Sequence, residues 1–202
     1  MRTLSLLLAL LVLAPAARAD DFTMDLRAPV RAGYAYTGIT RAPAFSLSFG
    51  ADVDVARVAK GLALTLVIDT EANARPDLPD EDRLSSFGGF GAGAGLFYLT
   101  EGQVGFGIES VAWATFDSQD LVGGGLSTRF YVIPFYVPME AAGERDGDHF
   151  SAWVRSSVSF WVMGRVDWTS DGNGATVAAG ISLDVGRILF LPYFAALRKA
   201  FK

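Results

Sequence analysis

The sequence contains no cysteine and a single histidine, and only three of its 17 basic residues are lysine. Without cysteine there is no disulfide framework, no thiolate nucleophile and no thiolate metal ligand. Acidic residues outnumber basic ones by 22 to 17, which argues against nucleic acid as a partner. After residue 19 no stretch has the roughly 18 uninterrupted apolar residues of a transmembrane helix. No cofactor is expected from the residues that remain.

The first 19 residues, MRTLSLLLALLVLAPAARA, have the three-part layout of a secretory signal peptide. Arg2 supplies the positive start, an apolar run follows over residues 4–14, and residues 17–19 form a small-x-small ending. The run is too short to span a bilayer, and Pro15 interrupts it. Export and cleavage after residue 19 are therefore predicted, and the mature chain becomes more acidic because both removed charges are arginines.

From residue 22 onward apolar and polar residues alternate, as in FSLSFGADVDV over residues 45–55. A period of two predicts a β-strand with one apolar and one polar face. Turn signals separate the strands, the strongest being Asp-Gly-Asn-Gly at residues 171–174. Eight strands are expected, over residues 22–36, 45–55, 62–69, 87–99, 104–109, from the turn at 117–120 to about 136, 150–168 and 177–185. Polar loops are expected over 72–86 and 138–149.

Many short strands with almost no helical period predict an all-β sandwich or barrel. An even number of strands favours an antiparallel up-and-down barrel, because closure removes both exposed edges. A single barrel domain is expected over residues 20–191. Residues 192–202 are expected to form a short amphipathic, helix-like tail, with Phe194, Leu197 and Phe201 on one face.

The charges on the polar parity of the strands predict which face lies inside. They comprise seven acids and five arginines and no lysine: Asp25, Arg27, Arg31, Asp52, Asp54, Asp69, Glu109, Arg129, Arg155, Arg165, Asp167 and Asp184. The interior of an eight-stranded barrel is just wide enough for side chains, so buried charges there have to pair. The planar five-donor guanidinium group of arginine suits such a network, whereas lysine would serve equally well on a wet surface. A luminal charge network is therefore predicted.

A stripe of glycines and the composition of the apolar parity favour the same orientation. The stripe is Gly89, Gly91, Gly93 and Gly95. If the stripe were exposed, it would only weaken its strand. If it faces inward, it leaves space for arginine and tryptophan side chains from opposite strands. The apolar parity is mostly aliphatic, and aromatic residues lie near the strand ends, where the girdles of membrane barrels are found: Tyr34, Tyr36, Tyr98 and Trp168. The apolar face is thus predicted to lie outward, against lipid.

With a signal peptide, no cysteine and strands that read apolar-out and polar-in, the chain resembles the small eight-stranded outer-membrane β-barrels of Gram-negative bacteria. The resemblance is one of pattern and covers nearly the whole mature chain. It implies a monomeric transmembrane barrel, in contact with outer-membrane lipid, that meets the barrel-assembly machinery during biogenesis. The segment from Gly180 to Val185 is similar to the signal that this machinery reads. The implied function is non-enzymatic, with a structural, surface-interaction or minor-pore role.

Two other functions remain open from the sequence. In a soluble periplasmic or secreted lipocalin-like barrel, the aliphatic parity would instead line an internal site for an apolar ligand. Alternatively, His149 and Ser151 resemble the His-x-Ser pair of the lipid A 3-O-deacylases, which are outer-membrane barrels and esterases, although Ala152 stands where that family has asparagine. The acidic groups at residues 77–82 and 146–148 lack EF-hand spacing and are expected to be solvated loops, so no metal site is predicted.

Overall fold

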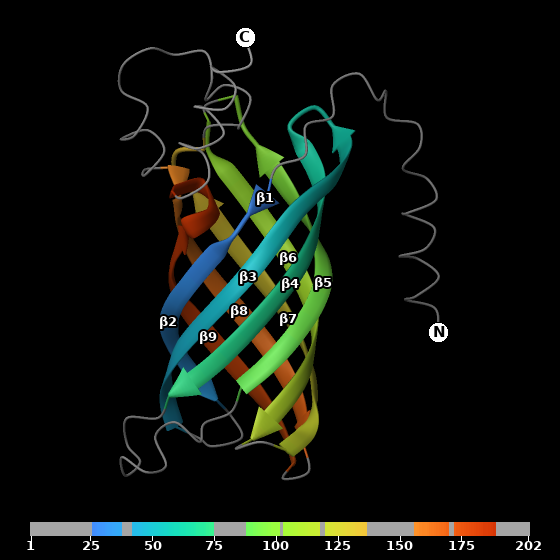
Figure 1. Ribbon diagram of the computed structural model, residues 1–202, viewed down its shortest axis with the longest axis vertical. Coiled ribbons are helices and arrows are strands. Elements are labelled where there is room, and N and C mark those ends of the chain that lie inside the picture. The colour runs from blue at the N-terminus through green and yellow to red at the C-terminus, as the bar shows by residue number, and fades with distance from the viewer. Residues whose placement is uncertain are drawn as a thin grey trace, which may run out of the picture.

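The computed structural model describes residues 26–37, 42–74, 88–101, 103–117, 120–136, 156–169 and 172–188, which form a β-barrel (Figure 1). Its strands are β1 (Leu26–Arg27), β2 (Pro29–Thr37), β3 (Ala42–Ala59), β4 (Leu62–Ala74), β5 (Gly88–Leu99), β6 (Gly105–Asp117), β7 (Asp120–Ile133), β8 (Val158–Thr169) and β9 (Gly172–Asp184). Within these residues no helix is long and apolar enough to cross a membrane.

The strands from β2 to β9 close into a ring in which each strand pairs with its neighbours in sequence. The ring closes because β2 pairs with both β3 and β9, and every pairing is antiparallel. The two-residue strand β1 continues β2 along β3, after an interruption at Ala28. The predicted eight-stranded antiparallel up-and-down barrel is therefore confirmed, and each strand from β2 to β9 is paired on both sides.

Several strand boundaries differ from those expected. β3 extends to Ala59 through two register shifts, and β4 continues to Ala74, so residues 72–74 belong to a strand and not to the expected loop. Residues 156–157 form a helical turn instead of continuing the strand that was expected from residue 150. β9 ends at Asp184, and residues 185–188 form one short helical turn. The predicted signal peptide and the tail at 192–202 lie outside the described residues.

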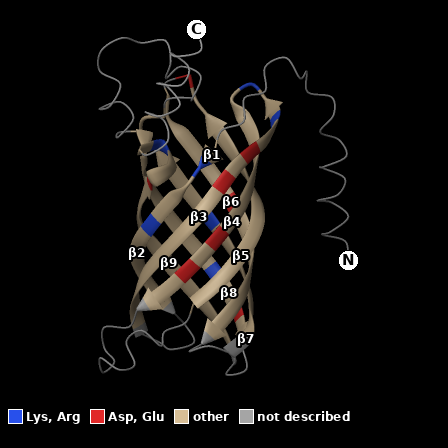
Figure 2. Ribbon diagram, viewed as in Figure 1, with Lys and Arg blue, Asp and Glu red and all other residues tan. Residues whose placement is uncertain are grey.

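The two faces of the barrel wall have opposite character. Large apolar side chains point outward, for example Phe49 at 54% exposed, Ile68 at 52% and Val177 at 65%. Charged positions are spread along the length of the strands and are not confined to the ends of the barrel (Figure 2). The arginine and acidic side chains among them lie mostly inside, as described below.

The two ends of the barrel differ in the segments that they carry. Residue 26, the turn at 60–61, the link between β5 and β6, and residues 185–188 lie at one end, which is called the terminal end here and is uppermost in Figure 1. The segment after β7 also leaves from this end. At the other end, called the opposite end, β2, β4, β6 and β8 end and β3, β5, β7 and β9 begin.

Candidate functional site

The lumen holds every described residue of the charge set predicted from parity. Ten of the twelve are described and are each at most 6% exposed: Arg27, Arg31, Asp52, Asp54, Asp69, Glu109, Arg129, Arg165, Asp167 and Asp184. Asp25 and Arg155 lie outside the described residues. Two further charged residues are buried with this set, Glu71 at 6% exposed and Arg187 at 1%.

A five-residue cluster, called the central cluster here, spans the lumen with Arg31, Arg129, Asp52, Asp69 and Glu109. Arg31 reaches Asp52 at 3.1 Å, Asp69 at 3.2 Å and Glu109 at 3.7 Å between nitrogen and oxygen. Arg129 reaches Asp69 at 2.6 Å and Glu109 at 3.2 Å. The five side chains come from β2, β3, β4, β6 and β7, so the cluster ties together five strands across the barrel.

A smaller group lies between the central cluster and the terminal end. Arg27 donates from Nη2 to Asp54 at 2.9 Å and to the Thr65 hydroxyl at 3.2 Å. Its Nη1 donates to the hydroxyl of Tyr131 at 2.9 Å, and the Thr65 hydroxyl donates to Asp54 at 2.7 Å. All four groups are buried, and they connect β1 with β3, β4 and β7.

A third group lies toward the opposite end, around Arg165. Its Nη1 contacts Glu71 at 2.6 Å and its Nε contacts Asp167 at 2.9 Å. Glu71 also accepts a hydrogen bond from the Ser46 hydroxyl at 3.0 Å. Ion pairs therefore recur at three levels along the lumen, which is the arrangement that makes buried charges tolerable.

Aromatic rings lie beneath the guanidinium groups and fill the space between these levels. The distances from the guanidinium carbon to the ring centroid are 4.5 Å for Arg27 over Phe97, 5.8 Å for Arg129 over Trp161, 5.4 Å for Arg165 over Trp113 and 4.1 Å for Arg187 over Tyr136. These distances allow cation–π attraction, so the rings add to the binding of the arginines as well as excluding water.

The glycine stripe on β5 provides space, but the adjacent strand uses that space. A Cβ atom on Gly91 would lie 2.5 Å from Cγ1 of Val111 and 2.9 Å from the Trp113 ring. One on Gly93 or Gly95 would collide with the backbone of β6. The expectation that opposite strands fill this space is wrong in detail, because side chains of β6 lean over β5 first. Trp113 reaches its place beneath Arg165 in this way.

Asp184 joins the first and last strands at the terminal end. Its Oδ1 accepts hydrogen bonds from the backbone N–H of Ala28 at 2.9 Å and of Arg187 at 3.2 Å. Its Oδ2 lies 3.1 Å from Nε of Arg187. Because a carboxylate at this position satisfies free N–H groups of the first helical turn, Asp184 also explains why β9 ends where it does.

Glu71 and Arg187 were not predicted from the sequence. Glu71 continues the inward parity of β4 two residues past Asp69, and the expected strand ended too early to include it. Arg187 follows the last strand, so no strand parity applies to it. The alternation of residues 69, 71 and 73 was the signal for Glu71, whereas nothing in the pattern indicated the helical turn that carries Arg187.

The ion pairs of the central cluster can hold the lumen shut. No group of three or more histidine, aspartate or glutamate side chains among them is placed to hold a metal ion. His149 and Ser151, the candidate esterase pair, lie outside the described residues. The acidic loops at 77–82 and 146–148 lie outside them as well.

Comparison with protein-family models gives no match, and comparison with curated proteins gives none either. Among solved structures, the chain is similar to Neisserial surface protein A. The two share 14% sequence identity with a TM-score of 0.47, over 81% of this chain and 99% of that one. The fold of the present chain is established by its own strand pairings.

Proposed function

We propose that this protein is an outer-membrane β-barrel of a Gram-negative bacterium, with a structural or surface-interaction role and no enzymatic activity. The observation that carries the proposal is the polarity of the wall, which is apolar outside and ionic inside. A barrel that folds in water needs apolar side chains inside and polar ones outside, because its interior has to supply the apolar core. The predicted signal peptide supports export, and the barrel-assembly machinery is the expected partner during biogenesis.

The exterior has the properties that hydrocarbon requires. A closed ring satisfies every strand edge internally, which the bilayer core demands of any spanning structure. Aromatic side chains lie outward near both ends of the wall, including Tyr36 and Trp168 toward the opposite end and Tyr98 and Phe106 toward the terminal end. Two such girdles flanking an aliphatic band are typical of outer-membrane barrels.

The lipocalin-like alternative needs the aliphatic parity inside the barrel. Instead Val162, Val177 and Ile181 are all more than half exposed on the outside. Among the described residues, guanidinium and carboxylate groups occupy much of the lumen, which is the opposite of an interior lined by the aliphatic parity. The geometry therefore favours lipid outside the barrel over lipid within it.

The central cluster also favours a closed barrel over a minor pore. It crosses the lumen from five strands, and eight strands leave little room beyond their own side chains. Reconstituted in planar bilayers, the protein is expected to show no steady conductance. In the membrane the end at which β2 begins and β9 ends would face the periplasm, as in the small outer-membrane barrels that the chain resembles.

Fractionation tests the proposal. The full chain, expressed in a Gram-negative host, is expected to sediment with outer membranes and to resist extraction by carbonate. Unheated samples are expected to migrate differently on gels from boiled ones. A soluble periplasmic protein from the same cells is the control. Recovery of this chain in the soluble periplasmic fraction would overturn the proposal in favour of the lipocalin-like alternative.

A further inference from the structure

One edge of β3 has no described partner near the terminal end. On the side of β2 and β1, the closed part of the ring ends where Leu26 lies opposite Val53. From there residues 54–59 of β3 run alongside β4 alone within the described part of the chain. Figure 1 shows β3 continuing past β1 to its turn with β4. This stretch, called the open edge here, presents backbone N–H and C=O groups to which another strand can add.

β1 shows the direction from which such a strand comes. Thr37 lies opposite Ala42 at one end of the shared ladder, and each step back along β2 meets a step forward along β3. The same count places Leu26 opposite Val53, so the interruption at Ala28 does not change the register. A chain that continues backward from Leu26 therefore comes to lie directly against the open edge.

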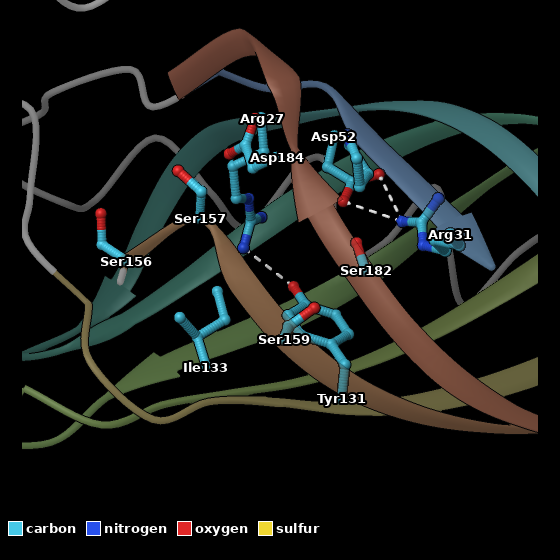
Figure 3. A pocket seen from close by; sticks show the side chains of 11 residues that line it. Arg27, Arg31, Asp52, Tyr131, Ile133, Ser156, Ser157, Ser159, Ser182 and Asp184 are labelled. Atoms are coloured by element: carbon cyan, nitrogen blue, oxygen red, sulfur yellow. Dashed lines mark hydrogen bonds and ion pairs between the residues drawn. The ribbon is translucent and has the colours of Figure 1, made fainter. Parts of the chain in front are cut away.

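Contacts inside the lumen hold β1 in this register. Arg27 donates to Asp54, the first residue of the open edge, at 2.9 Å and to the Tyr131 hydroxyl across the lumen at 2.9 Å (Figure 3). The backbone N–H of Ala28 donates to Asp184 at 2.9 Å. Because β1 and the residue after it are bound in this way, the chain before β1 enters the barrel at a fixed place.

The chain before β1 has the length of the open edge. After the predicted cleavage at residue 19, residues 20–25 precede β1 in the mature protein. Continued step for step, the register brings Asp25 opposite Asp54 and Asp20 opposite Ala59, where β3 ends. The register shifts between β3 and β4 in this stretch move such pairs by a residue or two. The mature chain therefore begins about level with the end of β3.

The segment also matches the open edge in charge and in pattern. It carries three acidic residues and no basic one: Asp20, Asp21 and Asp25. On the open edge Asp54 is already bound by Arg27 at 2.9 Å, so the edge presents the charge of the exposed Arg57. Opposite charges on neighbouring strands attract. Phe22 shares the parity of Leu26, whose side chain is 49% exposed, and so continues the apolar side of the wall.

We propose that the mature N-terminal segment, residues 20–25, docks on the open edge of β3 as a continuation of β1. The chain's own first residues are the occupant because they already lead into β1 beside that edge, which gives them a high effective concentration there. The segment satisfies the backbone groups of the edge, and the mature N-terminus becomes part of the barrel wall. The inference depends on the predicted cleavage, and it holds whether or not the barrel lies in a membrane.

Amide hydrogen exchange tests the docking. The mature chain, residues 20–202, is folded in detergent micelles, and exchange is followed residue by residue by NMR. In the double variant Phe22→Pro with Thr23→Pro, one N–H that faces β3 is lost whichever residue carries it, because neighbouring residues of a strand point their N–H groups to opposite sides. The matched control, Phe22→Ala with Thr23→Ala, changes the same side chains and keeps both N–H groups.

Within residues 54–59, the amides that do not bond to β4 are expected to be protected in the mature chain and in the alanine control. They are expected to exchange about tenfold faster in the proline variant, whereas the amide of Ser182 in β9 serves as an unchanged reference. Rapid exchange in all three proteins would overturn the proposal, because the edge is then open. Slow exchange in all three would overturn it as well, and loss of that protection on dilution would identify a second copy of the chain as the occupant.

Heat-dependent gel migration of the same samples shows separately whether each protein has formed the barrel. If the proline variant fails this check, a chain that lacks residues 20–23 takes its place and carries the same expectation.

Discussion

Replacement of Arg129 by methionine is expected to be among the most damaging single changes in the lumen. Arg129 is 2% exposed and contacts Asp69 at 2.6 Å and Glu109 at 3.2 Å. Its loss leaves three carboxylates of the central cluster with Arg31 as the one remaining cation. Removing one member of a buried ion pair costs about 3–5 kcal/mol of unfolding free energy, because the partner stays buried without compensation.

The opposite change in charge should be nearly harmless at the same place. The central cluster has one more acid than it has arginines, so Glu109→Gln brings it to two of each. Glu109 also makes the longer contacts, and its Oε1 has no hydrogen bond within the described residues. A glutamine oxygen can still accept from Arg129, so the expected loss is below about 1 kcal/mol.

Urea titration of the folded protein in detergent, followed by tryptophan fluorescence, measures both variants. Trp161 lies under Arg129 and serves as a local probe. The double variant Arg129→Met with Asp69→Asn should recover part of the loss, since it removes both sides of the shortest contact. If Glu109→Gln costs as much as Arg129→Met, the excess of acids over arginines does not decide the stability of the cluster and the charge argument is refuted.

Three further predictions concern the wall and the terminal end. Gly93→Ala is expected to lower the unfolding free energy by about 1–3 kcal/mol, because the new Cβ would collide with the backbone of β6. In the control Gly164→Ala the new Cβ meets nothing within 4 Å, so equal urea midpoints for the two variants would contradict the prediction. Val177→Arg should cost about 2–4 kcal/mol in lipid bilayers and Val58→Arg, at the end of β3, much less; equal costs on refolding into vesicles would argue against a lipid-facing wall. Asp184→Ala is expected to cost about 1–2 kcal/mol through the lost cap and to speed hydrogen exchange at the terminal end; unchanged exchange there would count against it.

The faces of the strands could be predicted from sequence because a period of two is a local property. Arg31, Asp52 and Asp184 each lie at the polar parity of their strand. That parity is the same whichever strand pairs alongside. A closed barrel can place either face of its strands inward. The predominance of arginine over lysine on the polar face favoured the arrangement of the structure, in which the polar face lies inside. The same reasoning placed the glycine stripe on the inner face.

The partners within the lumen could not be predicted in this way. The contact between Arg129 and Asp69 joins residues 60 positions apart, and it depends on the registers of all the strands between them. A shift of one residue in any pairing would turn a whole strand inside out. Asp184 also accepts from the backbone N–H of Ala28, which is a tertiary contact between the start of β2 and the end of β9.

Because β2 pairs with β9, the first long strand of the barrel has its full set of partners only when the last strand is present. Until residues 172–184 are available, β2 can pair only with β3. The charged side chains of the polar face then have no enclosed lumen in which to form their ion pairs. The barrel therefore cannot close before its last strand is available. A chain that stops short of β9 is left with two unpaired strand edges and an open ionic face, so on the proposed function a complete chain is a condition for a stable barrel in the membrane.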